Sequence, residues 1–94
     1  MQPFVQRMAL PFNTGTLANT TPLPVDMAGA PCPSTVTLKS SAAGRKIELS
    51  TDGGTEYFTP AYDTTSATML VVTLNANVSH VRFTGQANDA WRVQ

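Results

Sequence analysis

The stretch KIELSTDGGTEYF, residues 46–58, indicates the fold class of this chain. Ile47 and Leu49 alternate with charged residues, which is the two-residue period of a half-buried strand. The TDGG that follows supplies an aspartate that can hydrogen-bond its own backbone and two glycines that accept the positive φ of tight hairpins. The pattern therefore predicts a strand, a turn and a second strand over TEYF, residues 55–58.

The loop sequence STDGGTEY within this stretch resembles the Asp box of sialidases and other β-propellers. Ser50, Asp52 and Gly54 match that motif. Glu56 stands where the motif has threonine, and Tyr57 stands where it has tryptophan. In those families the box is a structural hairpin, usually repeated, that lies away from the catalytic site. The resemblance therefore implies a bend and carries over no activity.

The same alternation recurs in most of the chain after residue 33. The runs STVTLK, SHVRFTG and AWRVQ place one set of apolar side chains on a single face: Val36, Leu38, Val81, Phe83, Trp91 and Val93. Segments rich in Gly, Asn, Asp and Ser separate the runs. Six short strands spaced by turns predict an all-β fold, a small antiparallel β-sandwich or barrel.

One run departs from the alternation. In ATMLVVTLNA, residues 67–76, Met69 to Val72 are apolar on both faces. Such a run is typical of a central strand, or of a strand whose outer face is covered by another subunit.

Six of the seven prolines lie in residues 1–33. Proline removes a ladder donor and pushes the preceding residue towards extended geometry. We therefore expect an extended proline-rich N-terminal arm over residues 1–33, followed by a compact β-domain over residues 34–94. The predicted partner-binding residues are the first apolar side chains of the arm: Phe4, Val5, Met8, Leu10 and Phe12. The arm can lie along its own domain, or along a neighbouring molecule by adding to an exposed sheet edge.

Composition narrows the classes of partner. The 94 residues carry six basic and six acidic side chains, for a formal net charge of zero and a charged fraction of 13%. This balance leaves no basic stripe for nucleic-acid phosphates.

The longest apolar run, MLVV, is far shorter than the ~20 residues that span a bilayer. Cys32 is the single cysteine, so no intrachain disulfide is expected. The N-terminus lacks a signal-peptide pattern, and we expect a protein made in the cytoplasm.

The titratable residues indicate no enzyme. His80 is the only histidine, and we expect it at a surface or interface because no nucleophile–base pair or set of metal ligands accompanies it. The aspartates are scattered: Asp26, Asp52, Asp63 and Asp89. Asp63 and Asp89 are predicted to cap turns. We therefore expect no catalytic residues, no metal site and no cofactor.

Two tyrosines offer an alternative binding function. Tyr57 and Tyr62, with neighbouring Asn or Thr, would suit a sugar-stacking platform, because amphipathic rings favour wet surfaces. A tyrosine in a loop also commonly caps a core. Both interpretations remain open at this point.

Small size, a hydroxyl-rich and charge-poor surface, and an apolar proline-rich arm form a combination that resembles the small accessory structural proteins of tailed bacteriophages, in particular head decoration or cement proteins. The stretch from Gly44 to Gly85, with its DGGxxY hairpin and its strands rich in Thr, Ser and Asn, is similar in style to phage virion β-domains. The resemblance implies a virion protein made in the host cytoplasm. It also implies a homo-oligomer, with a trimer as the best expectation, and the major capsid protein or other virion proteins as partners. The alternative is a tail or fibre accessory module that binds a host-surface glycan.

Overall fold

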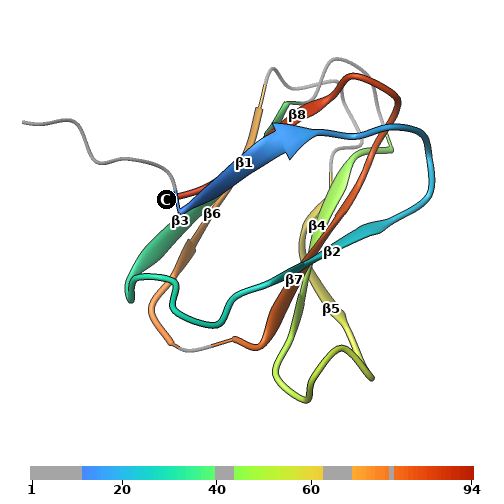
Figure 1. Ribbon diagram of the computed structural model, residues 1–94. Coiled ribbons are helices and arrows are strands. Elements are labelled where there is room, and N and C mark those ends of the chain that lie inside the picture. The colour runs from blue at the N-terminus through green and yellow to red at the C-terminus, as the bar shows by residue number, and fades with distance from the viewer. Residues whose placement is uncertain (1–11, 40–43, 63–68, 77) are drawn as a thin grey trace, which may run out of the picture.

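The computed structural model describes residues 12–39, 44–62, 69–76 and 78–94. Within these residues the chain is all-β, and eight strands form two four-stranded antiparallel sheets that face each other (Figure 1). The predicted fold class is confirmed. The described residues contain no helical segment that could span a lipid bilayer.

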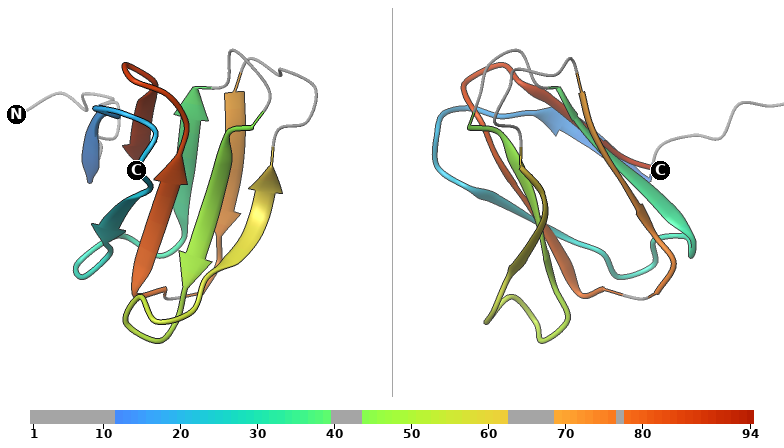
Figure 2. Two further views of the ribbon diagram at one scale, coloured as in Figure 1. Left: turned by 90° about the vertical axis from the view of Figure 1, so that its right-hand side faces the viewer. Right: turned by 180° about the vertical axis from the view of Figure 1, so that it is seen from behind.

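The two sheets are named sheet A and sheet B. Sheet A has the order β1-β8-β3-β6, from β1 (Asn13–Thr16), β8 (Ala90–Val93), β3 (Ser34–Lys39) and β6 (Met69–Leu74). Sheet B has the order β2-β7-β4-β5, from β2 (Leu23–Asp26), β7 (His80–Thr84), β4 (Lys46–Ser50) and β5 (Phe58–Tyr62). Figure 2 shows the two layers, with the β1 and β2 edges on one side and the β6 and β5 edges on the other.

The core lies between the sheets and follows the two-residue alternation of the sequence. Its fully buried side chains include Val36, Leu38, Ile47, Val81, Phe83 and Val93. Phe83 from sheet B stacks on Trp91 from sheet A, with ring centroids 5.2 Å apart. The facing predicted for these positions is confirmed.

Residues 12–33 differ from the extended arm expected there. They form β1, which pairs with β8, and β2, which pairs with β7. They also add Leu17, Val25 and Met27 to the buried core. Both strands lie at sheet edges, where a proline such as Pro24 costs no ladder hydrogen bond. The compact domain thus includes residues from 12 onward, and the arm expected over residues 1–11 lies outside the described residues.

The prediction of a central strand over the MLVV run is wrong. β6 pairs with β3 alone and lies at the edge of sheet A. Its inner side chains face the core, whereas Met69 and Val71 on the outer face remain 54% and 49% exposed. The other interpretation, an outer face covered by another subunit, stays a prediction.

The second strand of the predicted hairpin begins later than expected. Residues 51–56 form bends, and β5 begins at Phe58 and contains Pro60. The register with β4 shifts between Ile47 and Leu49, which indicates a β-bulge. The turn is longer than TDGG because side chains within the loop hold its backbone, and Pro60 is accommodated at a bulged edge strand.

Candidate functional site

The loop of residues 50–57 is a closed bend, as its turn residues predict. The buried Ser50 hydroxyl donates to Asp52 Oδ1 at 2.8 Å and accepts a hydrogen bond from the Gly54 amide at 2.9 Å. Asp52 Oδ1 also accepts from the amides of Thr55 and Glu56, at 3.1 and 3.0 Å. The Glu56 amide and the Ser50 hydroxyl hold the pKa of Asp52 below its ordinary value. These polar groups stabilise the bend itself.

A second set of hydrogen bonds fixes this loop to the segment before β7. Ser79 Oγ accepts from the Gly53 amide at 2.9 Å and donates to the Ser50 carbonyl at 3.0 Å. The Ser79 amide donates to the same carbonyl at 2.9 Å. Gly53 adopts a φ of 81°, a conformation that glycine accepts readily. The loop is therefore held from both sides.

Tyr57 covers an ion pair on the outer face of sheet B. The Arg82 guanidinium carbon lies 3.9 Å from the centroid of the Tyr57 ring. Arg82 Nε and Nη2 each donate to a carboxylate oxygen of Glu48 at 3.0 Å. The hydrogen bond to Glu48 raises the pKa of Arg82. One face of the Tyr57 ring is thus occupied by the guanidinium and is not available to stack on a sugar.

Tyr62 lies in different surroundings. It is 58% exposed, stands opposite Lys46 in the β4–β5 register, and borders a surface cavity of about 540 Å³. The cavity is lined by Gly44, Lys46, Thr59, Tyr62 and Thr84. Tyr57 and Tyr62 are five residues apart along an extended segment, a separation of roughly 16 Å. The structure therefore does not join the two tyrosines into one platform.

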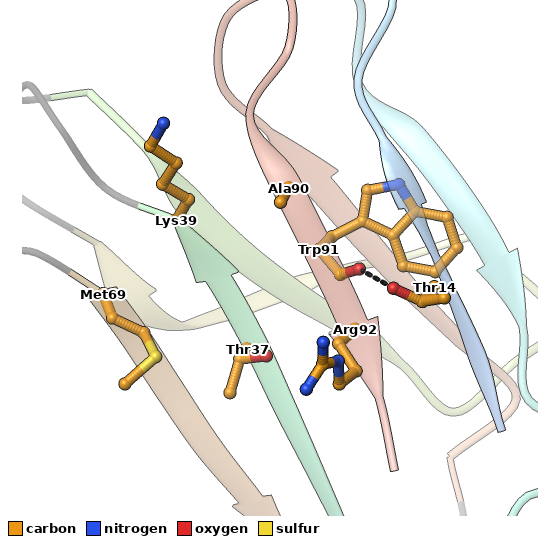
Figure 3. A pocket seen from close by; sticks show the side chains of 7 residues that line it. All are labelled: Thr14, Thr37, Lys39, Met69, Ala90, Trp91 and Arg92. Atoms are coloured by element: carbon orange, nitrogen blue, oxygen red, sulfur yellow. Dashed lines mark hydrogen bonds between the residues drawn. The ribbon is translucent and has the colours of Figure 1, made fainter. Parts of the chain in front are cut away.

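The outer face of sheet A carries a second cavity, of about 300 Å³ (Figure 3). It is lined by Thr14, Thr37, Lys39, Met69, Ala90, Trp91 and Arg92. Thr37 pairs with Arg92 across β3 and β8, and Lys39 pairs with Met69 across β3 and β6. This surface combines hydroxyls, two basic side chains and an exposed thioether. No carboxylate lines it.

Of the predicted partner-binding residues, only Phe12 lies within the described residues; Phe4, Val5, Met8 and Leu10 lie outside them. The Phe12 amide donates to the Val93 carbonyl at 2.7 Å, which continues the pairing of β1 with β8. The Phe12 side chain is 37% exposed. Its backbone is therefore part of the domain's own sheet rather than of a free arm.

The acidic residues and the histidine form no candidate metal centre among the described residues. His80 begins β7 and is half-buried near Gly54. Cys32 is a free, exposed thiol. Asp63, for which turn capping is predicted, lies outside the described residues.

The sequence did not predict a buried ion pair that joins the segment before β4 to the segment before β8. Asp89 Oδ2 accepts from the Gln86 amide at 2.9 Å, which is the predicted turn cap. The same carboxylate pairs with Arg45, with Nε–Oδ2 at 2.7 Å and Nη2–Oδ1 at 3.2 Å. Burial would raise the pKa of Asp89, but the hydrogen bonds from Arg45 and Gln86 outweigh it and keep that pKa below its ordinary value. A separation of 44 residues gives no local sequence signal for this pair.

Compared with models of known protein families, with curated proteins and with solved structures, the chain matches none of them.

Proposed function

We propose that this chain is a virion structural protein, a capsid decoration or cement protein. It attaches to the shell and to neighbouring copies through its N-terminal segment and stabilises the particle. The observation that carries the proposal is the edge strand β6, which exposes about half of Met69 and of Val71 on the outer face of sheet A. Exposed apolar side chains that adjoin one another are typical of surfaces that meet another protein.

The distribution of charge supports a passive, assembling role. The pairs Arg45–Asp89 and Arg82–Glu48 pair four of the chain's twelve charged side chains with one another. The outer face of sheet A presents mainly threonine hydroxyls and apolar groups between Lys39 and Arg92. A surface of this kind associates with other surfaces more readily than a densely charged one.

The N-terminal segment supplies the anchors. Its apolar side chains are Phe4, Val5, Met8 and Leu10. At about 25 cal/mol per Å², burial of several such side chains would contribute some kcal/mol per copy before the costs of ordering are subtracted. Repeated over many lattice contacts, this contribution would help the shell to resist the pressure of packaged DNA. The partners are the major capsid protein or other virion proteins, and the copies form a homo-oligomer, with a trimer as the first expectation.

Removal of residues 1–11 tests the proposal. The cut falls before Phe12 because the Phe12 amide is hydrogen-bonded to Val93 within the domain. We expect the truncated protein to fold but to lose attachment when it is mixed with purified particles that lack it and sedimented. The full chain should bind each particle in hundreds of copies, as a repeated lattice contact requires, rather than in a few to a dozen.

The control is the same truncated protein in a near-ultraviolet circular dichroism measurement, which reports the stacked Phe83 and Trp91. Truncated protein that retains this signal and still decorates particles at full copy number would contradict the role of the N-terminal segment.

The surroundings of Tyr62 support a second candidate function, that of a tail or fibre module that binds a host-surface glycan. Its exposed ring, the hydroxyls of Thr59 and Thr84 and the nearby cavity suit a sugar. A glycan array tests this function: Tyr62→Ala should remove any binding, whereas Tyr57→Phe should leave it unchanged because that ring already stacks on Arg82. An array without reproducible binding by the full chain argues against this candidate.

A further inference from the structure

The four edge strands of the described sheets are not equally protected against pairing with another chain. Native proteins block such edges with proline, bulges, charge or short length. β2 contains Pro24, and β5 contains Pro60 beside a bulge. β1 is four residues long, polar, and interrupted by Gly15. Three of the four edges are therefore poor templates for a further strand.

β6 is the unprotected edge. Its six residues, MLVVTL, contain neither proline nor a charged side chain. It is hydrogen-bonded to β3 on one side only within the described residues. Met69 and Val71 are half exposed on its outer face, and Leu70 and Val72 are only partly buried on its inner face. An additional strand would cover side chains on both faces of β6.

We propose that the N-terminal segment of a second copy, residues 4–10, adds a strand to this free edge of β6. The proposal rests on the proposed function and names the surface that receives the segment on a neighbouring copy. The sequence FVQRMAL lies between Pro3 and Pro11, so it offers seven consecutive residues that can donate backbone hydrogen bonds. Its length is close to that of the six-residue β6.

The length of the chain excludes the copy's own β6. Phe12 is bonded to Val93 beside β1, and β1 and β6 lie at opposite edges of sheet A. The position beyond β6 is four strand spacings from β1, about 19 Å. A chain needs roughly six residues to cover that distance, whereas Pro11 alone separates residues 4–10 from Phe12. Residues 4–10 can therefore lie along β6 only if the strand belongs to another copy.

The side chains of the segment agree with this position. As a strand, it places Phe4, Gln6, Met8 and Leu10 on one face, where the three apolar members would extend the partly buried inner row of Leu70 and Val72. The opposite face carries Val5, Arg7 and Ala9, and Arg7 would remain in solvent beside the outer face of sheet A. Backbone hydrogen bonds would supply the affinity, and the alternating side chains would set the register.

Sedimentation of full-length variants tests the proposal. Wild-type protein should self-associate with rising concentration. Val71→Lys introduces a charge of the kind that protects natural sheet edges, and we expect it to weaken self-association at least tenfold. Met8→Asp should weaken it by a similar factor because it changes the inserted strand. Thr16→Lys is the matched control: it adds the same charge to the outer face of sheet A at the β1 edge and should leave association unchanged.

Circular dichroism checks that each variant is folded, and Met69→Lys replaces Val71→Lys if the latter does not fold. The proposal is overturned by a wild-type chain that stays monomeric, or by a Val71→Lys chain that associates like wild type. Loss of association in Val71→Lys but not in Met8→Asp would indicate direct β6–β6 pairing and would also overturn it.

Particle binding separates this proposal from the function on which it rests. If Val71→Lys protein associates like wild type while removal of residues 1–11 abolishes decoration, the function stands and the position on β6 fails. If removal of residues 1–11 leaves decoration intact, the proposed function fails whatever the state of association.

Discussion

Gly85 follows β7 at a position that has no room for a side chain. A Cβ atom at this residue would lie 2.6 Å from Asp89 Oδ2 and 3.0 Å from Leu17 Cδ1. Asp89 cannot move away easily because both of its oxygens are hydrogen-bonded to Arg45. The absence of a side chain at Gly85 is therefore required by the buried ion pair, and not by a left-handed backbone.

Gly85→Ala should lower the free energy of unfolding by about 2–4 kcal/mol, the range for overpacking combined with a disturbed buried pair. Gly44→Ala is a useful control, because nothing lies within 4 Å of its Cβ position but its φ is +98°. That control should lose only about 1–2 kcal/mol from backbone strain. Urea denaturation measures both values. A Gly85→Ala chain as stable as wild type would show that the neighbours of Gly85 rearrange freely.

Asp89→Asn should destabilise the fold by about 3 kcal/mol at neutral pH, since it removes the charge from one side of a buried ion pair with Arg45. Asp26→Asn is the control. Asp26 is exposed, and its side chain accepts a hydrogen bond from the Ala28 amide. We expect its replacement to lower the free energy of unfolding by less than about 1 kcal/mol. Chemical denaturation at pH 7 distinguishes the two; equal losses would contradict the importance of the pair.

The pKa of Asp89 also predicts the pH dependence of stability. Because this pKa is lowered in the folded state, the carboxylate contributes stability above its unfolded pKa of about 3.9, and the contribution is lost as the pH falls through the folded-state pKa. As the pH falls from about 5 through the folded-state pKa, wild-type protein should therefore lose stability more steeply than Asp89→Asn. Parallel acid profiles for the two chains would count against this assignment.

At the scale of the elements, the 50–57 loop connects β4 with β5 and depends on one buried hydroxyl. Ser50 is fully buried, and its Oγ both accepts from the Gly54 amide and donates to Asp52. The loop therefore holds its shape through the end of β4, although most of its own residues are exposed. Its shape in turn places Tyr57 over Arg82.

Ser50→Ala should lower the free energy of unfolding by about 1–2 kcal/mol, because it leaves the Gly54 amide without its acceptor. Hydrogen exchange of that amide should accelerate. Thr51→Ala, next to it and exposed, should change neither quantity measurably. Unchanged exchange at Gly54 in Ser50→Ala would mean that the bend is held by Asp52 and Ser79 alone.

On the scale of the whole molecule, residues 12–33 belong to the same sandwich as the rest of the described chain. β1 and β2 complete one edge of each sheet, and this segment supplies three buried apolar side chains. Each such side chain stabilises the fold by about 1.5–3 kcal/mol, so together they approach the whole stability of a small domain. A domain that begins at residue 34 would therefore have lost most of its stability.

We expect a fragment of residues 34–94 to be unfolded, and a fragment of residues 12–94 to remain within about 1 kcal/mol of the full chain. Thermal denaturation followed by circular dichroism compares the three proteins. A cooperative transition in the 34–94 fragment would contradict the contribution of β1 and β2, and would support the boundary expected from the proline distribution.

The all-β class and the inward faces of β3, β4, β7 and β8 could be predicted from the order of the residues alone. These properties depend on alternation between neighbouring residues, as in Ile47 and Leu49, and such a pattern is local. The bend at Asp52 could be predicted in the same way, because turn chemistry acts over a few residues. The partner-binding role of Phe4 to Leu10 stays a prediction.

The order of the strands, in contrast, could be read only from the folded chain. The tertiary structure places β6 at an edge although its sequence is apolar on both faces, it gives residues 12–27 to the two sheets, and it brings Arg45 to Asp89. It also places the Tyr57 ring over the Arg82 guanidinium, away from Tyr62. Pairing between strands far apart in the chain depends on the free energy of the whole sandwich, and no single stretch of residues records which strand becomes the neighbour of which.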